Sequence, residues 1–149
     1  MALISCFHAK LECQKCKKIT PNDVSICNSL IDNGYSYDLR VGDKVPDLVV
    51  GDFTDEYLTI NMPDGNLINV LEDWQCPICN SWEWAKLFFN KDILEEIKSV
   101  VLNKQVLDEI NFITYRVDQP FEWIVGKPMY EDEKIKDNFI KILKEHLTD

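Results

Sequence analysis

Long apolar runs, glycine and histidine are all scarce in this chain. No apolar stretch approaches the roughly 20 residues that a membrane-spanning helix needs. The chain has only five glycines, and they form no glycine-rich loop of the kind that binds phosphate. It has only two histidines, and they form no His-Glu-x-x-His motif of the metalloproteases. No basic segment, apolar core and cleavage site of a secretory signal are evident near the first residue. We therefore expect a cytoplasmic protein that neither spans a membrane nor acts as an enzyme.

The two histidines, His8 and His146, are consistent with a protein that is not an enzyme. His8 lies in a strand-like segment and is at best a replacement for a missing metal ligand. His146 lies near the end of a predicted C-terminal helix, where a cation interacts favourably with the helix dipole. Adjacent acids such as Asp55 and Glu56 are typical of a solvated surface rather than of an acid–base pair.

Basic side chains are missing from residues 45–85, although the whole chain has 16 of them against 26 acidic side chains and a net charge of −10. Two interpretations remain open for this stretch. It forms either a solvated surface that aids solubility or a docking face for a basic protein. The residues that we predict to contact such a partner are Asp52, Asp55, Glu56, Asp64, Glu72 and Asp73.

The negative charge also argues against binding to nucleic acid. A nucleic-acid-binding protein neutralises phosphates with clustered lysine and arginine side chains. The small basic cluster in this chain, Lys10, Lys15, Lys17 and Lys18, surrounds a cysteine pair. We expect these lysines to balance the charge of nearby thiolates instead.

Two Cys-x-x-Cys pairs, Cys13/Cys16 and Cys76/Cys79, are the most informative motif. Each pair can form a tight turn that directs two sulfurs at one point, and together they supply the four thiolates of a tetrahedral ion. We predict a structural Zn²⁺ site. An iron centre with the same ligands remains an alternative, as do disulfides, a redox pair and cysteines that only pack.

At these four cysteines the chain resembles zinc ribbons and rubredoxins. In those families a glycine usually follows the second cysteine of each pair, because that residue adopts the left-handed conformation. Lys17 and Asn80 occupy the two positions here. The resemblance implies a closed four-thiolate metal site and left-handed backbone at both residues.

Cys6 and Cys27 lie outside the two pairs. Thiols stay reduced in the cytoplasm, so we expect no disulfide framework. We expect Cys6 to be a buried small apolar residue, while Cys27 is an alternative fourth ligand if the first turn proves unsuitable.

The order of predicted elements indicates an α+β protein. Residues 57–61 and 67–71 flank a turn that contains Asp64-Gly65 and predict a β-hairpin. Residues 81–87 favour a strand over a helix, and residues 92–102 have apolar side chains at helical spacing. Further strands are predicted at residues 3–11, 35–41 and 110–117, and a helix at residues 131–147.

We expect one domain over residues 1–149, since a chain of this length can bury a sizeable core. Residues 1–89 are predicted to form a β-rich, zinc-ribbon-like half clasped by the four-cysteine site, and residues 90–149 a mixed part that ends in helix. The predicted function is a protein-binding module, most concretely a bacterial immunity protein that neutralises a basic toxin such as a nuclease. A zinc-ribbon adaptor that binds nucleic acid or a transcription complex, and a rubredoxin-like electron carrier, are the alternatives.

Overall fold

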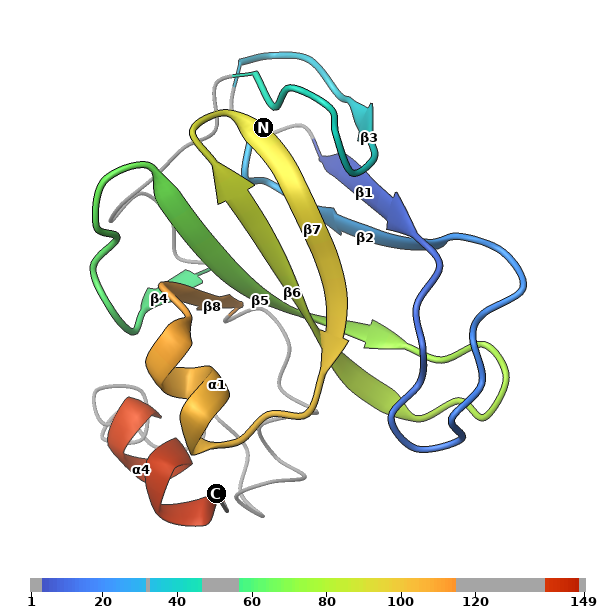
Figure 1. Cartoon of the computed structure of the whole chain (residues 1–149), viewed down its shortest axis with the longest axis vertical. Coiled ribbons are helices and arrows are strands. Elements are labelled where there is room, and N and C mark those ends of the chain that lie inside the picture. Colours follow the sequence, from blue (N-terminus) through green and yellow to red (C-terminus); the bar gives the residue numbers. More distant parts are fainter. Residues whose placement is uncertain (1–3, 32, 47–56, 115–138, 148–149) are drawn as a thin grey trace.

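Two β-sheets form most of the structure. The computed structural model describes residues 4–31, 33–46, 57–114 and 139–147. A three-stranded sheet has the order β2-β1-β3, and a five-stranded sheet has the order β4-β8-β5-β6-β7 (Figure 1). The small sheet consists of β1 (Ser5–Ala9), β2 (Val24–Asn28) and β3 (Asp38–Leu39). The large sheet consists of β4 (Tyr57–Thr59), β5 (Leu67–Gln75), β6 (Trp82–Asn90), β7 (Ile93–Val100) and β8 (Phe112–Thr114).

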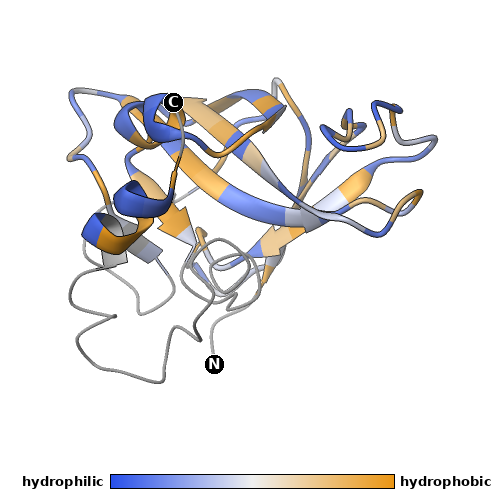
Figure 2. Cartoon of the chain, turned by 90° about the horizontal axis from the view of Figure 1, so that it is seen from below, coloured by the Kyte–Doolittle hydropathy of each residue, from blue (hydrophilic) through white to orange (hydrophobic). Residues whose placement is uncertain are grey.

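Alternating burial fixes the orientation of the small sheet. Ser5 and Phe7 of β1 are buried, whereas the intervening residues are partly exposed. A strand directs successive side chains to opposite faces, so one face of the sheet is packed inward and the other meets solvent. Figure 2 shows that the strands carry both hydrophobic and hydrophilic residues.

The large sheet is covered on both faces. On one face Phe7 of the small sheet meets Phe89 of β6 edge to face, with ring centroids 5.8 Å apart. On the other face Leu71 of β5 packs in a second apolar cluster with Leu107 and Leu143. These two leucines belong to the helices α1 (Lys104–Glu109) and α4 (Phe139–His146), which lie together at one end of the molecule in Figure 1.

The predicted α+β class is wrong, because no helical C-terminal part forms in the described residues. Residues 92–102, predicted as a helix, contain the strand β7, which pairs antiparallel with β6 from Asn90↔Ile93 to Trp84↔Val100. Of the predicted helix over 131–147, the structure describes 139–147, where α4 forms eight residues. Neither α1 nor α4, the two helices of the described ranges, is long and apolar enough to cross a bilayer.

The predicted hairpin between residues 57–61 and 67–71 is also wrong. Both segments contain strands, but β4 pairs with β8, and β8 pairs in parallel with β5. The local turn therefore joins strands that are not neighbours. The strand preferred for residues 81–87 is confirmed by β6, which pairs with β5 over nine residues. The two Cys-x-x-Cys pairs lie in loops, one after β1 and the other between β5 and β6.

Candidate metal centre

Two loops with matching backbone hydrogen bonds hold the four cysteines. In the first loop the Lys17 amide donates to the Cys13 carbonyl at 2.9 Å, and the Cys13 amide donates to the Lys18 carbonyl at 3.0 Å. In the second loop the Asn80 amide donates to the Cys76 carbonyl at 2.8 Å, and the Cys76 amide donates to the carbonyl of the residue after Asn80 at 2.9 Å. The two turns thus have the same internal bonding, although they are distant in sequence.

The residue after each cysteine pair adopts the left-handed conformation. Lys17 has φ of 63° and Asn80 has φ of 61°. This agrees with the conformation that the zinc-ribbon resemblance implied. Residues other than glycine rarely adopt it, because the Cβ atom approaches the following carbonyl oxygen. Lys17 and Asn80 adopt this conformation despite its steric cost. Each of the two turns thereby directs both sulfurs of its cysteine pair to one point.

The four sulfurs come together in one cluster. Their Sγ atoms all lie within 4.8 Å of one another, with Cys13 Sγ 3.6 Å from Cys79 Sγ and Cys16 Sγ 3.9 Å from Cys76 Sγ. Thiolates bound at about 2.3 Å to a tetrahedral Zn²⁺ ion are roughly 3.8 Å apart. Cys13 and Cys76 are buried and the other two are half-buried, so the cluster lies just below the surface. The four cysteines are therefore close enough to bind a metal ion.

Polar groups next to the sulfurs can orient them. Ser81 Oγ lies 3.1 Å from Cys79 Sγ and 3.4 Å from Cys13 Sγ, within hydrogen-bonding distance for sulfur. Glu83 Oε1 accepts a hydrogen bond from the Lys15 amide at 3.1 Å and lies 3.2 Å from Cys13 Sγ. Such outer contacts fix the direction of metal ligands and adjust their basicity.

The surroundings shift the pKa values of two thiols in opposite directions. Burial raises the pKa of Cys13 to about 12, since the thiolate loses its hydration. The Ser81 hydroxyl bonds to the sulfur of Cys79 and lowers the pKa of this thiol to about 6, because hydrogen bonds favour the charged form. A metal ion would have to displace the proton from Cys13, whereas Cys79 is already a thiolate near neutral pH.

Only one of the described acidic residues from the predicted partner surface is fully exposed. Asp64 is exposed and Asp73 is half-buried. The prediction that Glu72 contacts a partner is wrong, because this residue is only 1% exposed. Its carboxylate accepts hydrogen bonds from the Tyr57 hydroxyl and from Asn28 Nδ2. The even-numbered residues of β5 face the small sheet, and this position places Glu72 in the interior. Asp52, Asp55 and Glu56 lie outside the described residues.

Cys6 and Cys27 form a disulfide, so the prediction that both stay reduced and separate is wrong in this structure. They are directly opposite each other on the antiparallel strands β1 and β2. Cys27 is therefore no substitute ligand for the four-cysteine cluster. A sequence signal for this placement does exist. Each cysteine is next to an apolar residue that is buried, Phe7 beside Cys6 and Ile26 beside Cys27, so the alternation of side chains along a strand puts both cysteines on the opposite, outer face.

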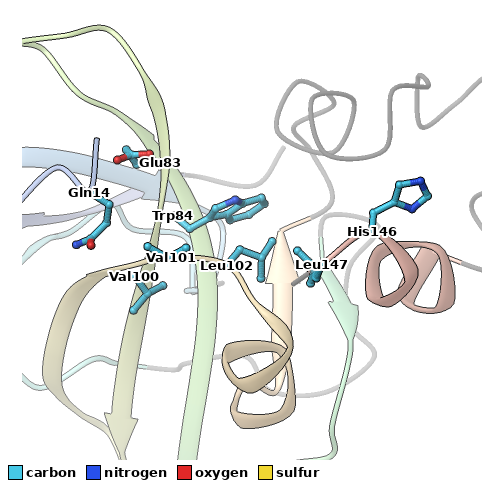
Figure 3. Close-up of a pocket in the computed structure, with 8 residues that line it drawn as sticks. All are labelled: Gln14, Glu83, Trp84, Val100, Val101, Leu102, His146 and Leu147. Carbon is cyan, nitrogen blue, oxygen red and sulfur yellow. The ribbon is translucent and has the colours of Figure 1, made fainter. Parts of the chain in front are cut away.

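A hollow of about 340 Å³ lies next to the cysteine cluster (Figure 3). Its lining includes Gln14, Glu83, Trp84, Leu102, His146 and Leu147. Glu83 belongs to both features, because it lines the hollow and also contacts Cys13. Sequence reasoning missed this hollow because its walls come from the first cysteine loop, β6 and the end of α4.

No protein-family model, no curated protein and no solved structure matches the chain. The likeness to zinc ribbons therefore rests on the two cysteine loops alone. What the described residues define is a cluster of four cysteines that can share one metal ion.

Proposed function

We propose that the chain binds one Zn²⁺ ion through Cys13, Cys16, Cys76 and Cys79, and that the ion is structural. The observation that carries this proposal is the convergence of four free thiols at the spacing of a tetrahedral site. Four thiolates leave no open position for water or substrate, which a catalytic zinc needs. Iron can use the same ligands, but closed four-cysteine sites in proteins most often hold zinc.

The zinc would join two segments that are far apart in the chain. Cys16 and Cys76 are 60 residues apart, and their loops have no regular pairing with each other in the described sheets. Binding would fix the tip of the β5–β6 hairpin to the loop after β1. Because such a site is formed only in the folded chain, metal binding contributes directly to folding. The four thiols must stay reduced for this role, so we propose a reducing compartment such as the cytoplasm, where the Cys6–Cys27 disulfide would also be open to reduction.

Metal analysis of the native protein tests the proposal. We expect about one zinc per chain and no stoichiometric iron, and Cys13→Ser should lose the zinc and lower thermal stability. The matched control is the double variant Cys6→Ser/Cys27→Ser, which also removes sulfur but should keep the zinc. A red preparation with one iron per chain would contradict the choice of metal. Equal zinc content in Cys13→Ser and in the control would contradict the site itself.

We also propose that the metal-tied domain serves as a protein-binding module through the loop between β4 and β5. Met62 in this loop and Leu67, the first residue of β5, are 74% and 47% exposed, and the exposed acid Asp64 lies between them in the sequence. Apolar side chains beside a charge are typical of contact surfaces for proteins. A basic protein is the partner that this charge favours. Neutralisation of a basic toxin is one form of this proposal.

A further inference from the structure

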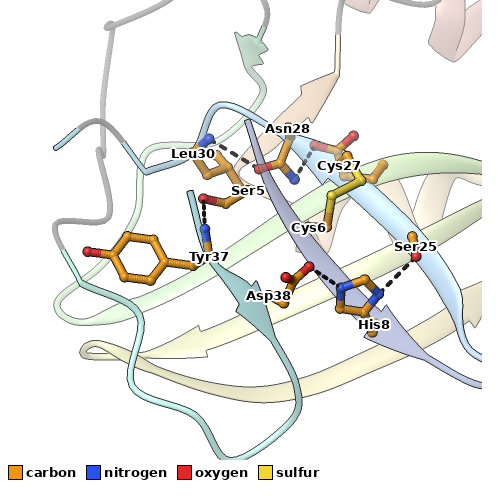
Figure 4. Close-up of a disulfide and its surroundings, with 10 residues drawn as sticks. Ser5, Cys6, His8, Ser25, Cys27, Asn28, Leu30, Tyr37 and Asp38 are labelled. Carbon is orange, nitrogen blue, oxygen red and sulfur yellow. Dashed lines mark hydrogen bonds and ion pairs between the residues drawn. A yellow bond between two sulfur atoms is a disulfide. The ribbon is translucent and has the colours of Figure 1, made fainter. Parts of the chain in front are cut away.

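The outer face of the small sheet carries a second group of side chains whose types are common metal ligands. Cys6 and His8 alternate with the buried residues of β1 and therefore point outward. On β2 the buried residues are Ile26 and Asn28, so Cys27 shares this outer face, as does Ser25. On β3 Leu39 is buried and Asp38 is exposed. Figure 4 shows these outward side chains next to one another around the disulfide.

The strand register places Cys6 at the centre of this group. Cys6 pairs with Cys27 on β2 and with Asp38 on β3, so the three residues form one row across the sheet. Neighbouring strands are roughly 4.8 Å apart, and residues two apart on one strand roughly 6.7 Å. His8 is two residues beyond Cys6 on the same face. All four side chains can therefore reach one point above Cys6.

His8 is held in place by an oxygen at each of its two ring nitrogens. Its Nδ1 is 2.8 Å from Ser25 Oγ, and its Nε2 is 2.8 Å from Asp38 Oδ1. A metal-bound histidine commonly directs one ring nitrogen at the ion and donates the other N–H to an oxygen. Ser25 can accept that N–H from Nδ1. Nε2 points at Asp38, and an ion bound by both residues would replace this direct contact. The His8 side chain is only 16% exposed, so this orientation is held by its surroundings.

We propose that Cys6, Cys27, His8 and Asp38 form a second Zn²⁺ site when the Cys6–Cys27 disulfide is reduced. A dithiol reductant transfers two electrons and two protons to the two sulfurs and becomes a disulfide itself. Zn²⁺ then displaces both thiol protons and binds two sulfurs, one imidazole nitrogen and one carboxylate oxygen. Two cysteines, a histidine and an aspartate are all ordinary ligands of tetrahedral zinc.

Zinc and the disulfide exclude each other at this site, because the same two sulfurs take part in both. Zinc binds only the reduced form, so it shifts the thiol–disulfide equilibrium toward reduction by mass action. An oxidant has the opposite effect and releases the ion. The face of the small sheet would thus hold zinc in a reducing compartment and a disulfide in an oxidising one. This inference does not depend on the four-cysteine centre, which uses different residues.

Zinc content of the full chain in two redox states tests the inference. One sample keeps the Cys6–Cys27 disulfide, and the other is reduced with a phosphine and then desalted without oxygen. Both receive excess Zn²⁺ and are passed through a weak chelating resin. We expect one zinc per chain more in the reduced sample. This difference is expected whether or not the four-cysteine centre binds zinc, so the two proposals can fail separately. Equal zinc content in the two samples would overturn the inference.

Variants identify the ligands of the additional ion. In the reduced chain, His8→Ala should weaken binding of the additional zinc at least tenfold, and Asp38→Asn should weaken it as well. His146→Ala is the matched control, because it removes the other histidine, on α4, and should leave both ions bound. Substitution with Co²⁺ provides an optical signal for thiolate ligands. If His8→Ala and His146→Ala bind the additional ion with equal affinity, the site is not the one proposed.

Discussion

At the residue scale, Cys13 and Cys79 belong to one cluster but differ in their chemistry. Cys13 is buried with a pKa of about 12, and Cys79 is half-buried with a pKa of about 6. The thiolate is the nucleophile in alkylation, so reactivity follows both the pKa and the access to the sulfur. In metal-free protein near pH 7, Cys79 is therefore the more reactive of the two sulfurs.

We predict that iodoacetamide labels Cys79 before Cys13 in the metal-free chain, as measured by peptide mass spectrometry. The pKa of Cys79 is lowered, so its labelling should decline only when the pH falls through about 6. The pKa of Cys13 is raised, so its labelling should remain slow up to pH values above 9. Ser81→Ala removes the first cause of the Cys79 shift and should move the labelling profile to higher pH. Identical profiles for the two cysteines would contradict this view of the site.

Each half of the candidate metal site was predictable from sequence, because the geometry of a Cys-x-x-Cys pair is local. A Cys-x-x-Cys pair needs only a tight turn to bring its two sulfurs together, and Lys17 and Asn80 take the conformation that such turns require. The placement of Glu72 and Cys27 was not predictable in that way. Each depends on which strand lies opposite, and sequence spacing does not fix strand pairing.

At the scale of elements, β7 shows why the spacing of apolar residues led to the wrong prediction of a helix over residues 92–102. Its apolar residues Ile93, Leu94, Ile97 and Val100 fit a helical stripe by spacing alone. The strand is instead selected by pairing with β6, whose register shifts between Phe88 and Phe89. Such an irregularity changes which residues face inward, so strict alternation is lost and a strand can resemble a helix. Tertiary pairing thus overrides the local pattern.

The loop between β4 and β5 carries the prediction about protein binding. Asp64→Lys reverses a charge on this exposed loop, and it should slow association with the basic protein that co-purifies with the full chain. Asp108→Lys on α1 makes the same change at another exposed acid and serves as the control. The rates are measured by surface plasmon resonance at low salt and near 1 M salt, where the Debye length is about 3 Å.

Three results would contradict a role for this loop. The wild-type rate should fall with salt, so a rate independent of salt would exclude electrostatic attraction as its cause. Equal rates for Asp64→Lys and Asp108→Lys would show that charge at the loop has no special effect. Failure of any basic protein to co-purify with the native chain would also count against the proposal.

At the scale of the whole molecule, the candidate metal centre lies at one edge of the apolar core, to which Cys13 and Cys76 also belong. The core between the sheets contains Phe7, Phe89 and Leu94, all fully buried. The second apolar cluster joins the large sheet to the two helices. The four-cysteine loops lie beyond β1 and at the tip of the β5–β6 hairpin, as Figure 1 shows. The proposed zinc would thus hold the end with the cysteine loops, while packing holds the centre and the end with the helices.

This division predicts that removal of zinc loosens the cysteine loops before it unfolds the sheets. A chelator should abolish amide hydrogen-exchange protection at residues 13–18 and 76–81, where the turn hydrogen bonds of both loops lie. Protection in the paired strands β6 and β7 should persist, because Leu87, Phe89 and Leu94 stay packed in a core of which the cysteines form only the edge. The melting temperature should fall by roughly 10 °C, since tight zinc binding contributes on the order of 4 kcal/mol.

Hydrogen-exchange mass spectrometry on the full chain, with and without the chelator, measures both effects. The Cys6→Ser/Cys27→Ser variant is the control, because it keeps the four zinc ligands and should respond to the chelator as the wild type does. Loss of protection throughout the chain would show that the core cannot fold without the metal. Unchanged protection at both loops would show that the four thiols hold no structural ion. Loss confined to the loops is the result that the arrangement of core and centre requires.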